Sequence, residues 1–321
     1  MYSYILNTND EKNSMNDIKP KISIGLPAYN AEKFMDKTIS SILNQTWRDF
    51  ELIISDNAST DKTSEICKKF ERMDSRIKFF KQEKNMGPYW NFNFVLEKAQ
   101  GEYFVWFATD DEHENTFLEK NLKILEENKN VVASISNVEY FGDNIDTIDM
   151  KNFFQNIKDK LKYRFDKKTK FIQVFPTNGT FERRATLYLR MDRSTAFYSL
   201  FRSSIIKKCM IITPFASSDL AIILNVLKHG QVNVLNEILM KKNLGGYSSK
   251  GIISYLRNQN TKLFYIIFMN LPFTMWCAKN LGAKIFLKNF DWFIVINAYG
   301  IFLILSDLIQ ILKNKSEKRD E

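Results

Sequence analysis

Apolar positions follow two different periods along the first 140 residues of the chain. Short runs of branched and aromatic residues are typical of buried strands, whereas the stretches between them place apolar residues at helical spacing. The predicted strands lie at residues 21–28, 50–55, 77–82, 131–141 and in the apolar part of 101–112. The predicted helices lie within residues 29–47, 61–73, 90–100 and 115–128. This alternation predicts an α/β fold, in which a mostly parallel sheet is flanked by helices.

The first predicted helix carries a start signal. Asn30 has a short polar side chain of the kind that caps helix N-termini, and Phe34, Ile39 and Ile42 follow it at helical spacing. We therefore expect Asn30 to cap this helix.

The pattern changes after residue 150. Residues 151–190 hold 11 Lys and Arg against three acidic residues and show weak periodicity, which predicts a basic connecting segment on the surface. This charge fits either a solvated face or a contact surface for phosphate or anionic lipid. Residues 195–245 return to a globular pattern, with a helix predicted at 218–229 and a strand at 232–239.

Two strongly apolar stretches, residues 263–282 and 292–312, lie near the C-terminus. The second has 21 residues, and a helix that crosses a bilayer needs about 20. Polar or helix-breaking residues interrupt both stretches, so we expect membrane-associated helices that either span the bilayer or lie in its plane. The basic segment KNKSEKR that follows predicts a cytoplasmic C-terminus. We therefore expect the protein at the cytoplasmic face of the cell membrane, either peripheral or anchored through this end.

Composition narrows the possible partners. The chain has 321 residues, a formal net charge of +9 and a pI near 9.2, which favours nucleic acid, a phosphorylated substrate or an anionic membrane. No nucleic-acid-binding motif accompanies this charge, so we set that partner aside. The three cysteines and two histidines form no CxxC or zinc pattern, which favours a reducing compartment. Residues 1–20 form a polar lead-in without the pattern of a signal peptide.

Polar or turn-forming residues follow four of the predicted strands. In parallel sheets of this kind, ligands bind beyond the carboxyl ends of the strands, so these segments are expected to form one site. They cover residues 27–30, 56–61, 85–87 and 110–112.

The residue types in these segments suit a nucleotide and a metal ion. The ring of Tyr29 could pack on a nucleobase while the carboxylate of Asp56 accepts an N–H from it. Asp110 and Asp111 are hard oxygen ligands suited to Mg²⁺ or Mn²⁺ shared with phosphate oxygens, although a solvated turn is the alternative interpretation of such a pair. No GxxxxGK[ST] or GxGxxG motif occurs, so neither a P-loop nor a dinucleotide fingerprint is supported. The combination points to an enzyme that uses a nucleotide-linked sugar.

Two long stretches carry four motifs in a recognisable order, ISIGLPAYNAEKFMDKTISSILNQTWRDFELIISDNASTD and EKNMGPYWNFNFVLEKAQGEYFVWFATDDE. They resemble family 2 glycosyltransferases of the GT-A fold, and a weaker likeness extends to about residue 245. The resemblance implies a UDP-, GDP- or dTDP-sugar donor, Mn²⁺ or Mg²⁺, and inversion at the anomeric carbon. It implies a catalytic domain at 21–250, with a nucleotide-sugar half at 21–140 and an acceptor half at 141–250, before the apolar region 251–321.

The resemblance also implies roles for individual residues. The base pocket would contain Pro27, Ala28 and Tyr29, with Asp56 as the acceptor for the base. The full nucleotide-sugar-binding set would be Pro27, Ala28, Tyr29, Asp56, Asn85, Gly87, Asn91 and Asp110.

The acidic residues would carry the chemistry. Asp111 and Asp110 match the family's metal-binding motif, and Asp219 matches the general base at the start of the acceptor-side helix. A helix N-cap is the alternative interpretation of Asp219. Two positions depart from the family pattern, because Ala108 and Ser218 stand where acidic residues are frequent.

The leading hypothesis is an inverting, metal-dependent glycosyltransferase that transfers a sugar to a hydroxyl of a glycan or lipid-linked acceptor during cell-surface glycan synthesis. A nucleotidyltransferase is one alternative, because it also pairs carboxylates with a metal and a nucleotide. A non-catalytic, degenerate transferase that acts as a membrane scaffold is another, supported by the altered Ala108 and Ser218 positions.

Overall fold

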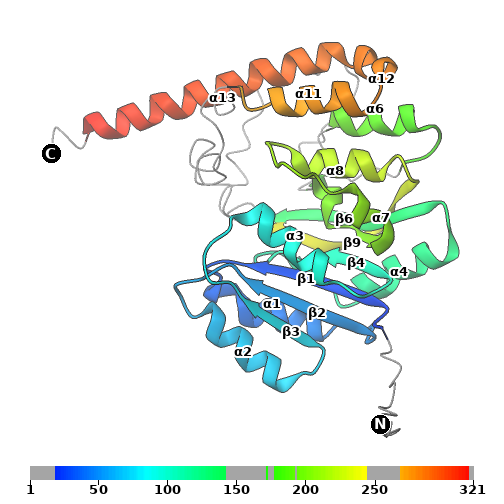
Figure 1. Ribbon diagram of the computed structural model, residues 1–321, viewed down its shortest axis with the longest axis vertical. Helices are drawn as coiled ribbons and strands as arrows, with labels where there is room; N and C mark the ends of the chain where they lie inside the picture. The colour runs from blue at the N-terminus through cyan, green and yellow to red at the C-terminus, as the bar shows by residue number, and fades with distance from the viewer. Residues whose placement is uncertain (1–18, 142–170, 173–176, 192–193, 244–267, 318–321) are drawn as a thin grey trace, which may run out of the picture.

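The chain folds around one sheet that carries helices on both faces (Figure 1). The structure, a computed structural model, describes residues 19–141, 171–172, 177–191, 194–243 and 268–317. The strands are β1 (Ile22–Ala28), β2 (Phe50–Asp56), β3 (Ile77–Lys81), β4 (Tyr103–Trp106), β5 (Glu112–His113), β6 (Val131–Phe141), β7 (Phe171–Ile172), β8 (Leu200–Arg202) and β9 (Gln231–Asn243). The helices are α1 (Glu32–Leu43), α2 (Thr63–Met73), α3 (Pro88–Lys98), α4 (Phe117–Glu127), α6 (Phe181–Met191), α7 (Ser203–Cys209), α8 (Ser218–Val226), α11 (Leu271–Asn280), α12 (Ala283–Lys288) and α13 (Phe290–Glu317), with the 3₁₀ helix η2 (Ser194–Tyr198).

The sheet is parallel in its first part and mixed in its second. Strands β3, β2, β1 and β4 lie side by side in parallel, and the order continues β8, β6, β9, β5. Strand β6 is parallel to β9, whereas β8, β5 and β7 each run antiparallel to their neighbours. The predicted mostly parallel sheet is confirmed. The short strands β5, β7 and β8 were not predicted, because two or three residues are too few to show a period.

The register aligns the carboxyl ends of the parallel strands. Ala28 at the end of β1 lies opposite Asp56 at the end of β2, and Asp56 lies opposite Lys81 at the end of β3. After β4, the N–H of Phe107 donates to the carbonyl of Gly25 at 2.9 Å, so this segment follows β1 to the same edge. The loops that the sequence predicts to form one site therefore start from one edge of the sheet.

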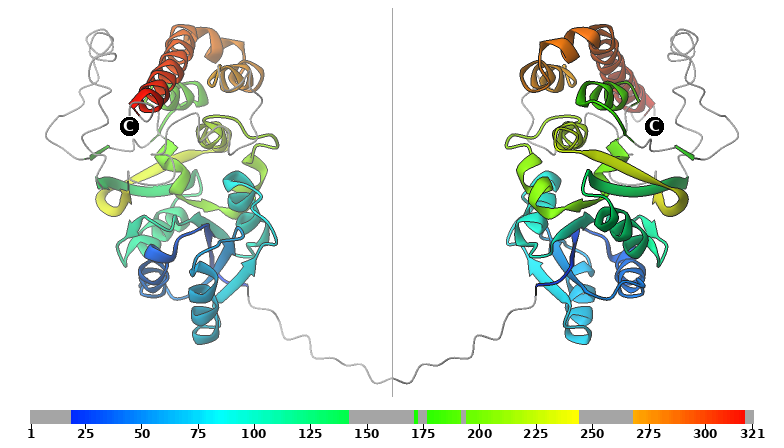
Figure 2. Two further views of the ribbon diagram at one scale, coloured as in Figure 1. Left: turned by 90° about the vertical axis from the view of Figure 1, so that its left-hand side faces the viewer. Right: turned by 90° about the vertical axis from the view of Figure 1, so that its right-hand side faces the viewer.

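Helices α1 and α4 lie on one face of the sheet, and α3 lies on the other (Figure 2). The contact of α3 with β1 requires Gly25, because a Cβ there would lie 2.7 Å from Cγ2 of Val95 and 2.8 Å from Cζ of Phe104. The strand side chains Ile24 and Leu26 are completely buried. Close packing on both faces thus holds the strand ends in fixed positions.

The start of α1 differs from the prediction. Ala31 occupies the N-cap position and has no side chain that could cap the helix, and the N–H of Glu32 donates to Oδ2 of Asp61 at 3.1 Å. Asn30 instead has a positive φ of 49°, a conformation that asparagine tolerates well. Its Oδ1 accepts a hydrogen bond from the N–H of Thr60 at 2.9 Å, and its own N–H donates to Oγ of Ser59 at 2.8 Å. Asn30 therefore joins the loops after β1 and β2.

Helix α6 corrects the prediction of a connecting segment at 151–190. Its buried residues are Ala185, Tyr188 and Leu189, and exposed or half-buried arginines alternate with them. This short apolar face escaped notice because the basic residues dominate the segment. Of the remaining part, only residues 171–172 and 177–180 lie within the described residues.

Helices α11, α12 and α13 form a layer above α6 and α8 (Figure 1). Phe273, Cys277, Ile285 and Phe293 from these helices are buried and belong to the hydrophobic core. Across the described part of the chain, no helix combines the length and the apolar character needed to cross a membrane, so the spanning alternative of the prediction is not supported there. The start of the first apolar stretch, residues 263–267, lies outside the described residues.

Candidate active site

Two adjoining chambers form a cleft beside the carboxyl ends of the parallel strands. The larger has a volume of about 1420 Å³ and is lined by the loops after β1, β2 and β3 together with α3. The smaller has a volume of about 350 Å³ and is lined by the turn after β4, η2, the start of α8 and the end of β9. The residues that line both chambers are Pro27, Pro88, Tyr89, Phe92, Met210 and Pro214.

The larger chamber contains most of the residues that the sequence assigns to donor binding. It is lined by Pro27, Ala28, Tyr29, Asn85, Gly87 and Asn91. The ring of Tyr29 is partly exposed and can therefore stack on a planar ligand. Gly87 has a φ of 88°, which glycine adopts without strain, and Pro88 then starts α3.

Asn57, which the sequence analysis did not single out, shapes the donor loop. Its Nδ2 donates to Oδ1 of Asn85 at 2.9 Å and to the carbonyl of Gly87 at 3.2 Å. Its Oδ1 accepts the N–H of Met86 at 2.9 Å. The buried side chain of Asn57 therefore fixes the loop between β3 and α3. The position of Asn57 directly after Asp56 was the signal in the sequence that could have identified it.

Asn91 ties the ends of β1 and β2 together. Its Nδ2 donates to the carbonyl of Ser55 at 3.0 Å and to the carbonyl of Ala28 at 3.3 Å. Its Oδ1 is buried and has no hydrogen-bond partner among the described residues. Because buried acceptors are costly when unpaired, this oxygen is a candidate contact for a ligand N–H or O–H in the chamber.

Asp56 does not line either chamber. It is fully buried, its Oδ1 accepts the N–H of Ser59 at 2.9 Å, and its Oδ2 accepts the hydroxyl of Ser64. The carboxylate thus stabilises the loop between β2 and α2. Its predicted contact with a base stays a prediction, and it would require this loop to rearrange.

The smaller chamber brings together three carboxylates that are far apart in sequence. Asp110, Asp111 and Asp219 all line it. Oδ1 of Asp111 accepts the N–H of Asn243 at 3.0 Å, whereas its Oδ2 is buried without a hydrogen-bond partner in the described part of the chain. Burial raises the pKa of Asp111 to about 6 and also raises the pKa of Asp110 and Asp219.

A divalent cation fits the donor set in this chamber. Hard cations prefer carboxylate oxygens, and the unpartnered Oδ2 of Asp111 can act as a ligand. The described residues contain no cluster of three or more His, Cys, Asp or Glu that could hold a metal by itself. Asp111 and Asp110 would therefore share a cation with phosphate oxygens and water, as Mg²⁺ and Mn²⁺ sites in nucleotide-binding proteins commonly do.

Asp219 lies inside α8, not at its cap. The N-cap residue is Ser217, which has a φ of 68° and makes no capping side-chain hydrogen bond. Asp219 occupies the first turn, where the helix dipole favours a negative charge, and its Oδ1 accepts the N–H of Leu220 at 2.8 Å. The N-cap interpretation of Asp219 is therefore wrong, and its position in the chamber is compatible with a general base.

Lys242 is a further residue of the chamber that the sequence analysis missed. It lines the smaller chamber, and its Nζ lies 4.0 Å from the centre of the Tyr198 ring. Its positive charge lowers the pKa of all three carboxylates and so opposes the effect of burial. The strand prediction stopped at residue 239, whereas β9 continues to Asn243. The available signal was the pair of adjacent lysines at the end of this strand. Because neighbouring strand residues point to opposite faces of the sheet, such a pair places one lysine on each face.

Comparison with known proteins places the chain in a family. Residues 23–208, more than half of the chain, match the model of glycosyl transferase family 2. An uncharacterized glycosyltransferase of Haemophilus influenzae is 42% identical over 114 residues, which are 36% of this chain and 46% of the relative. A Campylobacter jejuni protein named GalNAc(5)-diNAcBac-PP-undecaprenol beta-1,3-glucosyltransferase is 38% identical over 94 residues, 29% of this chain and 30% of that protein. These matches span less than half of each relative.

Solved structures share the fold. The mannosyltransferase PcManGT from Pyrobaculum calidifontis, in complex with GDP-Man and Mn²⁺, has a TM-score of 0.54 and 12% identity, covering 92% of this chain and 76% of its own. Residues 1–349 of S. aureus TarS with UDP-GlcNAc give a TM-score of 0.52 and 18% identity, covering 74% of this chain and 64% of that one. The fold is therefore of the GT-A type. The chain belongs to glycosyl transferase family 2, as the sequence predicts.

Proposed function

We propose that this protein is an inverting glycosyltransferase that moves a sugar from a nucleotide-diphospho-sugar to a hydroxyl group. The observation that carries the proposal is the convergence of Asp110, Asp111 and Asp219 in a chamber that adjoins the predicted donor pocket. Family membership supports the reaction class. The neighbours in complex with GDP-Man and UDP-GlcNAc support a donor of the same chemical class.

The donor would lie across both chambers. Its nucleoside would occupy the larger chamber, against the ring of Tyr29 and within reach of the unpartnered Oδ1 of Asn91. Its diphosphate would lie where the chambers meet, and its sugar would enter the smaller chamber. Lys242 would then offer a fixed positive charge to the diphosphate.

Asp219 would act as the general base. Its carboxylate takes the proton of the acceptor hydroxyl while the hydroxyl oxygen forms a bond to the anomeric carbon. The bond from that carbon to the diphosphate oxygen breaks, and its electron pair leaves with the nucleoside diphosphate. Attack on the face opposite the leaving group inverts the anomeric configuration. Because burial raises the pKa of Asp219, this carboxylate is a stronger base than an exposed aspartate.

Asp111 and Asp110 would hold a divalent cation at the diphosphate end of the site. When bound, Mn²⁺ or Mg²⁺ supplies Lewis-acid stabilisation to the departing phosphate oxygens. The two aspartates would position the diphosphate end of the donor relative to Asp219, which comes from the first turn of α8.

The acceptor would be a cell-surface glycan or its lipid-linked precursor, met at the cytoplasmic face of the membrane. The name of the Campylobacter relative, which includes an undecaprenol-linked saccharide, supports a lipid-linked acceptor. The net charge of +9 supports an anionic membrane face as the setting.

The decisive experiment combines donor binding with product analysis. A panel of UDP-, GDP- and dTDP-sugars is screened by thermal shift with Mn²⁺, and the best donor is incubated with glycan and lipid-linked acceptors. We expect release of a nucleoside diphosphate and a product of inverted configuration by NMR. Release of a sugar 1-phosphate, the leaving group when the nucleotidyl group of the donor is transferred, would instead identify a nucleotidyltransferase. Tight donor binding with neither transfer nor hydrolysis would favour a non-catalytic scaffold.

A further inference from the structure

Helix α13 presents a long apolar surface that nothing in the described structure covers. Its exposed apolar residues are between 37% and 58% exposed. We call six of them the apolar stripe: Phe290, Ile294, Ile301, Leu305, Leu308 and Ile309. Their spacing of mostly three, four or seven residues places them along one side of the helix. At 1.5 Å per residue, the stripe extends over roughly 28 Å, which is far more than an isolated exposed side chain.

The opposite side of α13 faces the protein in its first half. Trp292 and Phe293 are buried there and belong to the core, and Ile304 is buried further along the helix. The second half of α13 extends beyond α11 (Figure 1). Helix α13 therefore has two apolar sides. One packs against the protein, and the other is directed outward.

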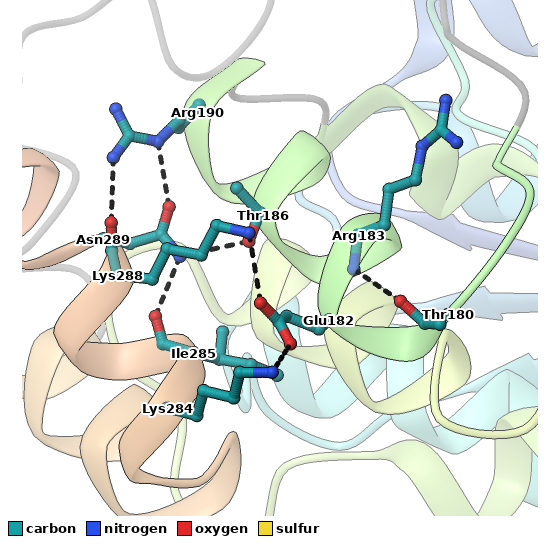
Figure 3. A network of polar contacts seen from close by, with 9 residues as sticks. All are labelled: Thr180, Glu182, Arg183, Thr186, Arg190, Lys284, Ile285, Lys288 and Asn289. Atoms are coloured by element: carbon teal, nitrogen blue, oxygen red, sulfur yellow. Dashed lines mark hydrogen bonds and ion pairs between the residues drawn. The ribbon is translucent and has the colours of Figure 1, made fainter.

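A polar network fixes the orientation of this helix (Figure 3). Asn289, which is fully buried just before α13, accepts the Nε–H of Arg190 at 2.9 Å and donates to Oγ1 of Thr186 at 3.2 Å. Nearby, Lys284 and Lys288 of α12 lie 2.7 and 3.1 Å from the carboxylate of Glu182 on α6. Exposed ion pairs contribute little by themselves, but the buried asparagine must keep its partners. The apolar stripe is thus presented in one defined direction.

The charge of the chain favours an anionic lipid surface over a second copy of the protein. Two copies that each carry +9 repel one another, whereas both are attracted to an anionic bilayer. The residues that follow the stripe, 313–319, hold four basic side chains and one acidic side chain. An apolar helix side followed by basic residues is the pattern of helices that lie in the interface of a bilayer.

We infer that the apolar stripe of α13 docks the protein onto an anionic lipid bilayer, with the helix lying in the plane of the interface. This inference deepens the proposed function by naming the surface that would meet a lipid-linked acceptor, and it rests on that function only for the acceptor.

Ring contacts link this surface to the candidate active site. Phe215, which lines the smaller chamber with Asp219, lies 6.4 Å from Phe273 and 6.5 Å from Trp276 of α11, measured between ring centres. The layer of α11, α12 and α13, which carries the stripe, is therefore in direct contact with the wall of the smaller chamber.

The test measures binding of the full chain to vesicles. Sedimentation compares POPC vesicles with 7:3 POPC/POPG vesicles, for the wild type and for the triple variant Leu305→Ser, Leu308→Ser, Ile309→Ser. We expect the wild type to bind POPC/POPG at least about tenfold more tightly than POPC, because basic residues add to apolar insertion. We expect the triple variant to bind POPC/POPG at least about tenfold more weakly than the wild type.

A matched control and a second readout keep the result interpretable. Met73→Ser replaces a strongly exposed apolar residue on α2, far from α13, and should leave vesicle binding unchanged. Absence of vesicle binding by the wild type, or equal binding by the triple variant, contradicts the inference. If the wild type does not bind vesicles but forms a concentration-dependent dimer, and only the triple variant abolishes this dimer, the stripe binds a second copy of the chain instead. Donor binding, measured without vesicles, should be unchanged in the triple variant, so a wrong donor assignment is detected separately.

Discussion

The two chambers of the cleft are built in different ways. Neutral hydrogen bonds hold the larger one, in which Asn57 fixes the loop at Asn85 and Asn91 joins the ends of β1 and β2. The smaller one gathers three carboxylates and Lys242 from positions spread over more than 130 residues, and burial raises the pKa of every carboxylate. The larger chamber is therefore stable without a ligand, whereas the smaller one buries carboxylates at a desolvation cost that a bound cation would offset.

This difference predicts which measurements respond to changes in each chamber. Substitutions in the smaller chamber should change the rate of transfer and the pH dependence of stability. Substitutions in the larger chamber should change stability at all pH values, because hydrogen bonds between neutral groups do not titrate. The predictions below test this separation, from the largest expected effect to the smallest.

Asp219→Asn should give the largest effect. It removes the carboxylate that would accept the proton but keeps its size, so we expect kcat to fall by about 10³-fold. Donor affinity should change less than about threefold, because the larger chamber is untouched. Steady-state transfer assays with a titration of donor binding separate the two effects. A variant with wild-type kcat would show that another group accepts the proton.

Asp111→Asn should change how stability depends on pH in the metal-free protein. The pKa of Asp111 rises from the ordinary value of 3.8 to about 6 on folding. Between these values the folded state binds more protons than the unfolded state, so the free energy of unfolding falls as pH rises through this window. The contribution of this one group reaches about 3 kcal/mol.

Urea unfolding in EDTA at pH 4, 5, 6 and 7 measures this loss. An asparagine side chain cannot ionise, so the Asp111→Asn variant should lose about 2 kcal/mol less than the wild type between pH 4 and 7, the part of the titration that this window covers. Asp110 and Asp219 keep raised pKa values in both proteins and leave a slope of the same sign. If the free energy of unfolding falls equally with pH in the two proteins, burial does not raise the pKa of Asp111.

The same contrast explains what the sequence could predict. The residues of the larger chamber follow the ends of local strands, and strand and helix periods are visible in short windows, so Tyr29, Asn85 and Gly87 could be placed together in advance. The structure also shows side-chain contacts that the spacing of apolar residues cannot predict. Asp56 faces the loop of α2, and Asn30 bridges two loops.

The smaller chamber was harder to predict, because its parts meet only through long-range pairing. Lys242 enters it because β9 pairs with β6 and continues to Asn243, which then donates to Asp111. Asp219 was found through family resemblance, because its local sequence alone favoured a helix cap. The apolar C-terminal stretch had the composition of a membrane span, but its residues divide between a packed side and an exposed side. Composition alone could not show that division.

Asn91→Leu should lower stability in the larger chamber. The change removes the two donated hydrogen bonds to Ser55 and Ala28, and Ala28 keeps its bond from the N–H of Asn57. We expect a loss of about 2 kcal/mol that is the same at pH 5 and pH 8. Asn93→Leu on the same helix breaks only an exposed bond to Glu97 and should cost less than about 0.5 kcal/mol. A strongly pH-dependent loss for Asn91→Leu would contradict the separation of the two chambers.

Lys242→Met should give the smallest of the main expected effects, a moderate loss of binding, together with a clear effect on pH dependence. Removing the positive charge takes away an electrostatic contact for the diphosphate, so metal-free binding of the nucleoside diphosphate should weaken by about tenfold. Lys242 also lowers the pKa of the three carboxylates, so its loss should raise those pKa values and move the acid limb of the rate profile to higher pH. Lys242→Arg should restore both properties, because it keeps the charge.

The matched control is Lys241→Met. Lys241 lies 3.9 Å from Glu139 and does not line the smaller chamber. If Lys241→Met and Lys242→Met shift the acid limb equally, the effect comes from net charge and not from the position of Lys242 among the carboxylates.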